Sequence, residues 1–170
     1  CAKYASRLDF NISNNSLKQS QETVRQWPWK SSVTHQKMIS PPALGIRIRM
    51  ELAEIYKHDN LNNVISIIHK WGIISILNEN IKVDKRFLRG LNWIKKLNGN
   101  YMLYLLKDAE DLGTACRRFL VNNGEKKILE DYSNIKKIFK TKHDKYIHYS
   151  PSSWTEFIEK RNLNDETVKL

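Results

Sequence analysis

Cysteine, proline, glycine and long apolar runs are all scarce in this chain, and the lack of cysteine and of long apolar runs excludes two classes of protein. Only two cysteines, four prolines and six glycines occur among 170 residues. Cys1 and Cys116 are too few and too far apart for a disulfide framework or a zinc ligand set. The longest apolar runs, such as residues 71–77, fall far short of the roughly 20 residues that cross a bilayer. We therefore expect a protein of the reducing cytoplasm that makes no use of a membrane.

Acidic residues are scarce relative to basic ones, which indicates an anionic partner. The chain has 29 Lys and Arg against 18 Asp and Glu, a formal net charge of +11 and a pI of about 9.6. Such a charge favours polyanions, namely RNA, DNA or anionic lipid. At 41% hydrophobic and 28% charged residues the composition is ordinary for a globular chain with one or two small cores.

The strong hydrophobic periods in this sequence are all close to 3.6 residues, which predicts an all-α protein of short antiparallel helices. The clearest pattern follows Ser40-Pro-Pro, which resembles a helix cap with prolines in the first turn. No alternating strand pattern competes with the helical one. Helices are predicted over residues 2–8, 14–26, 41–55, 61–71, 87–97, 101–106, 112–119, 128–139, 153–161 and 165–170.

Short polar residues and glycines predict where these helices begin and end. Ser13 or Asn15 is expected to cap the second helix, and Ser153 with Glu156 has the spacing of a capping box. Gly72, Gly99 and Gly124 are read as breaks, and residues 27–40 as a loop. The expected core includes the apolar residues Leu44, Ile48, Leu52, Leu61, Ile65, Ile68, Leu91 and Ile94.

The sequence contains no recognisable catalytic constellation. It has no glycine-rich phosphate loop, no His-Glu-x-x-His and no Asp-x-Asp that would hold paired magnesium ions. His143 and His148 are five residues apart, a spacing that puts them on different sides of a helix, so solvated histidines are favoured over a metal site. The carboxylates of residues 108–111 precede a helix, where they interact favourably with its dipole.

Clusters of basic residues are the most informative feature. Between Lys82 and Tyr104 only Asp84 is acidic, which favours a surface for a polyanion over an ordinary solvated face. Aromatic residues nearby, at positions 71, 93, 101 and 104, offer stacking planes for unpaired bases, although the helical spacing of Trp71 favours the core. The expected RNA-binding residues are Lys82, Lys85, Arg86, Arg89, Lys95, Lys96, Arg117, Arg118, Lys126 and Lys127.

Three segments of the sequence, at residues 1–10, 47–52 and 67–77, together resemble motifs of the class II tRNA nucleotidyltransferases and the related poly(A) polymerases, cyanobacterial members in particular. The opening Cys1-Ala-Lys-Tyr-Ala-Ser-Arg-Leu-Asp-Phe10 is similar to the family's Arg-Ala-x-Arg-(Phe/Tyr)-Ala-x-x-Leu-Gly-Phe, with Lys3 in place of Arg and Asp9 in place of Gly. Arg47-Ile-Arg-Met-Glu-Leu52 looks like the neck motif Arg-(Ile/Met)-x-x-Glu-(Leu/Met). Residues 67–77 resemble the leucine-rich helix and Gly-Leu-Leu segment that follow it.

The resemblance implies a neck over residues 1–77 and part of a helical body over residues 78–170, which together bind tRNA for CCA or A addition at the 3′ end. The family's catalytic head, with its magnesium-binding Asp-x-Asp and its Glu-Asp-x-x-Arg, is then expected before Cys1. The chain alone would hold no cofactor and be inactive, whereas the full-length family enzyme uses magnesium with ATP and CTP. A head located before Cys1, as the resemblance implies, would also explain why the sequence begins in the middle of a helix.

The same resemblance implies that Lys3, Tyr4, Arg47 and Glu51 support the nucleotide pocket. From spacing alone, Arg47 and Glu51 are also suited to an intrahelical ion pair. Two alternatives stay open for the whole chain. One is a catalytically empty helical module for RNA or protein interaction, and the other, less favoured, is a basic helical protein of the membrane surface.

Overall fold

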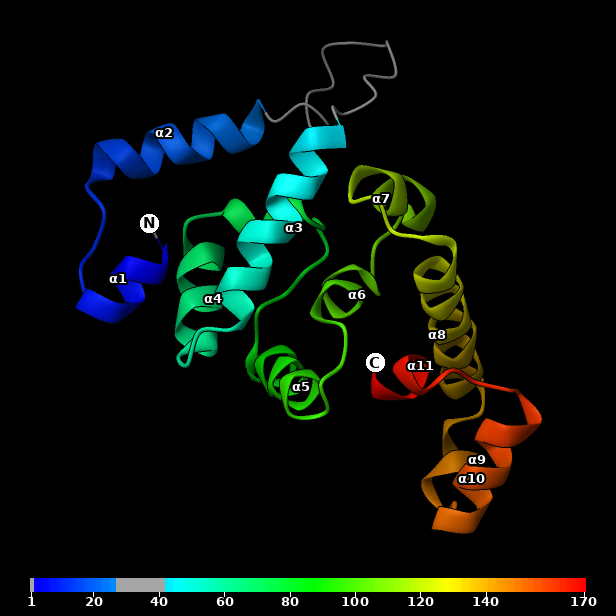
Figure 1. Ribbon diagram of the computed structural model, residues 1–170. Coiled ribbons are helices and arrows are strands. Elements are labelled where there is room, and N and C mark those ends of the chain that lie inside the picture. Colours follow the sequence, from blue (N-terminus) through cyan, green and yellow to red (C-terminus); the bar gives the residue numbers. More distant parts are fainter. Residues whose placement is uncertain (1, 27–41) are drawn as a thin grey trace.

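The chain folds into helices, as its hydrophobic periods predict. The computed structural model describes residues 2–26 and 42–170, and within these ranges it contains helices, turns and loops but no strand (Figure 1). The all-α prediction is confirmed; the predicted loop over residues 27–40 and the Ser40 cap lie outside the described residues. The helices are α1 Ala2–Leu8, α2 Asn14–Arg25, α3 Pro42–Tyr56, α4 Leu61–Lys70, the 3₁₀ turn η1 Ile73–Ile76, α5 Lys85–Lys96, α6 Tyr101–Leu106, α7 Leu112–Arg118, α8 Asn123–Thr141, α9 His143–Ile147, α10 Pro151–Lys160 and α11 Asp165–Lys169.

Most helix ends follow the capping signals in the sequence. Ser13 caps α2, where its hydroxyl oxygen accepts a hydrogen bond from the Ser16 amide at 3.2 Å. Gly72, with φ of 77°, ends α4 in the left-handed conformation that glycine adopts without strain. After α5 it is Asn98, at φ 51°, that turns left-handed, and the amide of Gly99 then donates to the Ile94 carbonyl at 2.8 Å.

Two predicted helix starts are wrong. The capping box at Ser153 is absent, because α10 begins earlier: Ser150 is the cap and accepts a hydrogen bond from the Ser153 amide at 3.2 Å. Pro151 at the first helical position favours this earlier start, since its missing amide would have no partner there. Gly124 does not separate helices but lies in the first turn of α8, where Asn122 and Glu125 form a capping box.

The hydrophobic core is centred on α6. Five of the six residues of this short helix, Met102 to Leu106, are buried, and Figure 1 shows α6 between α3, α5 and α8. Of the predicted core, Leu44 and Ile48 are only half-buried, whereas the remaining six, Leu52, Leu61, Ile65, Ile68, Leu91 and Ile94, are buried as expected. One apolar cluster thus runs from Ala2 to Leu129 across the predicted boundary at residue 77.

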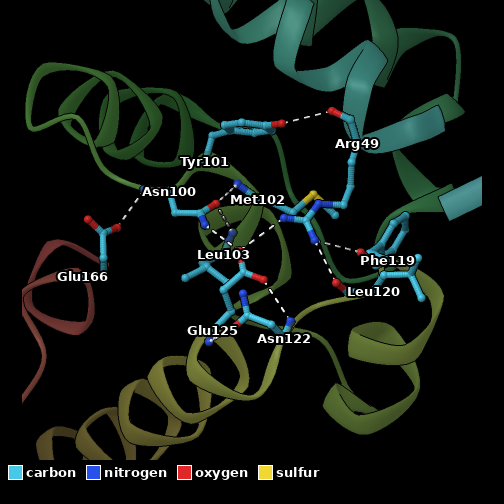
Figure 2. Close-up of polar contacts among 10 residues, drawn as sticks. All are labelled: Arg49, Asn100, Tyr101, Met102, Leu103, Phe119, Leu120, Asn122, Glu125 and Glu166. Carbon is cyan, nitrogen blue, oxygen red and sulfur yellow. Dashed lines mark hydrogen bonds and ion pairs between the residues drawn. The ribbon is translucent and has the colours of Figure 1, made fainter. Parts of the chain in front are cut away.

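A polar junction fastens α3 to the segment between α7 and α8 (Figure 2). The Arg49 guanidinium donates to the carbonyls of Phe119 and Leu120, each at 3.0 Å. Its second nitrogen lies 3.2 Å from Oε1 of Glu125 on α8. That oxygen also accepts a hydrogen bond from Asn100 Nδ2 at 3.0 Å, so one carboxylate joins two side chains from different parts of the chain.

The start of α6 completes this junction. The Tyr101 hydroxyl donates to the Arg49 carbonyl at 3.0 Å, and the Asn100 amide donates to a Glu166 carboxylate oxygen of α11 at 2.8 Å. Figure 2 shows these groups converging from four helices. The junction therefore connects α3, α6, α8 and α11.

A tyrosine ring packed on Gly90 and one lysine fix the position of α5. A Cβ atom added at Gly90 would lie 2.1 Å from the Tyr104 hydroxyl oxygen, so any larger residue there would displace the Tyr104 side chain. That hydroxyl donates to the Phe87 carbonyl at 2.9 Å. At the other end of α5, Lys95 Nζ donates to the His58 carbonyl at 2.9 Å. The inner side of α5 is thereby held against the core, and its other side is left to solvent.

Candidate nucleic-acid interface

The outer side of α5 carries a set of exposed basic residues. Asp84 caps the helix, its carboxylate accepting a hydrogen bond from the Phe87 amide at 2.7 Å, and Leu91 and Ile94 point into the core. The helical period that buries these two residues turns the charged ones outward. Within Lys85–Lys96 there is no acidic residue. We call the exposed residues Lys85, Arg86, Arg89, Trp93 and Lys96 the α5 basic face.

The four cations of the α5 basic face have no acidic partner among the described residues. None of Lys85, Arg86, Arg89 and Lys96 forms an ion pair with a carboxylate in residues 2–26 and 42–170. Lys85 and Arg89 are one turn apart, a spacing at which like charges repel and destabilise a helix slightly. A face of this kind is suited to binding a polyanion, whose charge would remove the repulsion.

Trp93 places a large aromatic ring between Arg89 and Lys96 on the α5 basic face. Its side chain is 59% exposed, and Lys96 Nζ lies 5.3 Å from the ring centroid, within cation–π range. The other three aromatic candidates are used inside the fold. Trp71 and Tyr104 are buried, and Tyr101 stacks on Tyr56 with ring centroids 4.7 Å apart.

Two further predicted RNA-binding residues lie close to the α5 basic face in sequence but differ in their surroundings. Lys82 is exposed in the turn before the helix. Lys95 is half-buried on the opposite side, where its ammonium group is held by the His58 carbonyl. Lys95 is thus brought into the packing between α5 and the α3–α4 connection rather than onto the exposed face.

The remaining predicted cations form a second group on α7 and α8, away from α5 (Figure 1). Arg117 is exposed and donates to the Thr114 hydroxyl at 2.7 Å, and Lys127 is exposed. Lys126 Nζ lies 3.5 Å from a carboxylate oxygen of Glu130. This group therefore uses part of its charge within the helices that carry it.

Arg118 lies nearest the core in this second group. It is half-buried, and burial lowers the pKa of its guanidinium, which the negative charges of Asp111 and Glu79 partly offset. Its backbone also packs closely against α3: a Cβ added at Gly45 would lie 1.9 Å from the Arg118 carbonyl oxygen. Arg118 thus contributes to helix packing as well as to surface charge.

The residues predicted to support a nucleotide pocket fall into two separate places. Arg47 and Glu51 are exposed on α3 and line an apolar groove of about 470 Å³ between α2, α3, α4 and η1. Within the described ranges no ion pair joins Arg47 to Glu51, so the predicted intrahelical pair is not formed. Lys3 and Tyr4 are exposed on α1 and do not line this groove.

Lys3 instead faces the far end of α3. Its charge acts on Glu54, whose pKa is lowered first by the hydrogen bond to Lys57 and then by the positive charges of Lys57 and Lys3. The four nucleotide-pocket residues thus do not form one site in this chain.

The structure shows two features near the α5 basic face that were not predicted from the sequence. A cavity of about 660 Å³ lies between α8, α10 and α11, with Arg86 at its edge and aromatic walls that include Tyr132, Phe139 and Trp154. Lys107 packs beside it, its Nζ 3.9 Å from the Tyr104 ring centroid and 5.1 Å from that of Tyr132. The regular spacing of aromatic residues in α8 was the available signal, but spacing does not reveal a cavity.

Three general findings complete the description. In the part of the chain that the structure describes, there is no group of three or more His, Cys, Asp or Glu side chains that could hold a metal ion. Over the same residues, no helix combines the length and the apolar character needed to cross a lipid bilayer. No protein-family model, curated protein or solved structure matches this chain.

Proposed function

We propose that this chain is the tRNA-binding neck and body part of an enzyme of the tRNA nucleotidyltransferase and poly(A) polymerase type. It acts in the cytoplasm and holds the RNA while a catalytic head, located before Cys1, adds nucleotides to the 3′ end. The magnesium ions and the ATP or CTP belong to that head, and no step of the transfer is assigned to residues of this chain. The chain alone binds RNA and is not expected to extend it.

The single observation that carries the proposal is the α5 basic face, with its exposed indole and its cations that pair with no carboxylate of residues 2–26 and 42–170. A solvated surface helix ordinarily intersperses acidic residues among basic ones. The lack of acids on α5 agrees with the net charge of +11 and favours a phosphate backbone as the partner. The resemblance adds support, since its first two motifs coincide with α1 and α3.

The test is the binding of labelled tRNA by fluorescence anisotropy over a range of salt concentrations. Lys85→Glu with Arg89→Glu should weaken binding and lower the slope of log affinity against log salt by roughly 0.7–0.9 for each phosphate that the variant no longer neutralises. Both side chains are exposed, so the double variant is expected to fold. Lys95 is unsuitable for charge reversal because its ammonium group holds α5 to the His58 carbonyl.

The matched control is Lys18→Glu with Arg25→Glu on α2, which removes the same charge from a helix remote from α5 in Figure 1. This control should lose much less affinity. Equal losses in the two double variants would mean that net charge alone drives binding and that α5 is not the site. If the wild-type chain binds no tRNA at low salt, the RNA-binding function itself is wrong.

A further inference from the structure

Trp93 is the exposed member of the four aromatic residues that lie among the basic clusters. Trp71 is 7% exposed and Tyr104 is 5% exposed, whereas Trp93 is 59% exposed. The Tyr101 ring is engaged by Tyr56, and its hydroxyl by the Arg49 carbonyl. Packing inside the fold therefore explains Trp71, Tyr101 and Tyr104 but does not explain Trp93.

The setting of Trp93 suits a nucleotide. Arg89 precedes it by one helical turn and Lys96 follows it by nearly one turn, so both lie on the same side of α5. One turn of helix rises about 5.4 Å, which lets a cation reach a phosphate next to a base placed on the ring. Lys96 Nζ, 5.3 Å from the ring centroid, already lies beside the indole.

We propose that Trp93 stacks on an unpaired base of the bound RNA while Arg89 and Lys96 contact the phosphates that flank it. This deepens the proposed function above and rests on it. Base pairs in a duplex are already stacked on each other and offer no free face to an indole, so the partner surface is a single-stranded segment. The stacking is independent of base identity, because every base has a π-face.

Binding of three labelled RNAs to the full chain tests this proposal. The probes are a short single strand, a duplex with the same number of phosphates and a single strand whose residues are abasic. Trp93→Ala should weaken binding of the single strand by about 5- to 150-fold, equivalent to about 1–3 kcal/mol per stacked base. Binding of the duplex should change little, and the salt slope should stay the same because no charge is removed.

Two controls separate stacking from a loss of structure. Trp93→Phe keeps an aromatic face and should retain most of the affinity, and Leu97→Ala truncates another exposed apolar residue, the one that follows α5, and should have no effect. The wild-type chain should bind the abasic strand about as weakly as Trp93→Ala binds the normal strand. This last comparison needs no variant and so does not depend on the folding of one.

The outcomes distinguish the two proposals. If Trp93→Ala binds the single strand as the wild type does, or loses the same factor on single strand and duplex, the stacking role is overturned while RNA binding stands. If the wild type binds abasic and normal strands equally, stacking is likewise overturned. Absence of wild-type binding to every RNA would instead overturn the proposed function.

Discussion

Lys107 lies against two tyrosine rings at the edge of the core. Its Nζ donates to the Leu170 carbonyl at 2.8 Å, and burial lowers the pKa of the ammonium group from 10.5 to about 8. The negative charge of Asp108 opposes this shift, and the positive charges of Lys136 and Arg86 add to it. At neutral pH the folded chain therefore keeps a partly desolvated charge that the unfolded chain solvates fully.

This desolvation predicts a rise in stability with pH. Between pH 8 and 10.5 the unfolded chain holds a proton that the folded chain has released, so raising the pH favours the folded state. The free energy of unfolding should rise by at most about 1.4 kcal/mol per pH unit from this group. Urea titrations from pH 7 to about pH 10 on the wild type and on Lys107→Met measure the difference.

The Met variant keeps the aliphatic packing and lacks the titrating group, so it is the reference. A difference between the two proteins that stays flat, or that falls as the pH rises, would contradict the assignment. Above about pH 10 both proteins should lose stability. Burial raises the pKa of Tyr104 and Tyr132 to about 12, so the folded chain keeps protons that the unfolded chain has released.

Helix α10 shows how a capping residue decides where an element begins. The Ser150 hydroxyl oxygen accepts a hydrogen bond from the Ser153 amide, which otherwise has no partner within the first turn. Ser150→Ala should therefore lower the free energy of unfolding by about 1 kcal/mol, within the range of about 0.5–2 kcal/mol for such caps. Ser153→Ala, within the helix, should have a smaller effect. Paired thermal unfolding measurements compare them, and equal effects would speak for a start at Ser153.

Periodicity predicted the helices well because it reports burial directly. Leu52, Leu61, Leu91 and Ile94 each belong to the helical apolar repeat of their own helix, and all four are buried. The starts of α8 and α10 were predicted too late in the sequence. In α8, Gly124 was interpreted as a break although it lies in the first turn. Ser153 with Glu156 fits the capping pattern as well as the real cap does, and only the chain path through Pro151 separates them.

The candidate interface was predicted in outline from the sequence, but only the structure separates the exposed cations from those that take part in packing. The absence of acids along α5 is visible in the sequence, and so is the helix itself. Which cations stay exposed is a tertiary matter. Lys95 and Lys96 are adjacent and chemically alike, but one is held by the His58 carbonyl and the other lies beside the Trp93 ring.

The polar junction at Arg49 connects helices from both halves of the chain, and it predicts a coupling between α3 and α8. The side chains of Arg49 and Glu125 are 29% and 15% exposed, so removing one leaves a poorly solvated partner. Arg49→Met should lower the free energy of unfolding by about 1–3 kcal/mol. A double-mutant cycle with Glu125→Gln should give an interaction energy of at least about 0.5 kcal/mol.

The matched control is the exposed pair of Lys57 and Glu54, whose side chains are 72% and 58% exposed. The same cycle there should give less than about 1 kcal/mol, as is usual for surface ion pairs. An Arg49 cycle no larger than this control would show that the junction does not couple the helices. The sequence offered no sign of this junction, because Arg49 follows the more conspicuous Arg47 and the partners of its guanidinium lie 70 residues or more away.

That separation also sets an order of events during synthesis. Glu125 follows Arg49 by 76 residues, and a ribosome that adds about 5–20 residues per second needs roughly 4–15 s to cover that interval. During this time α4, α5, α6 and α7 are made in turn, and the apolar sides of α3 and α4 lack α6 for the first part of the interval. Among the described residues, Arg49 therefore has no carboxylate partner for its guanidinium until the start of α8 has been made, so the junction is among the last contacts to form.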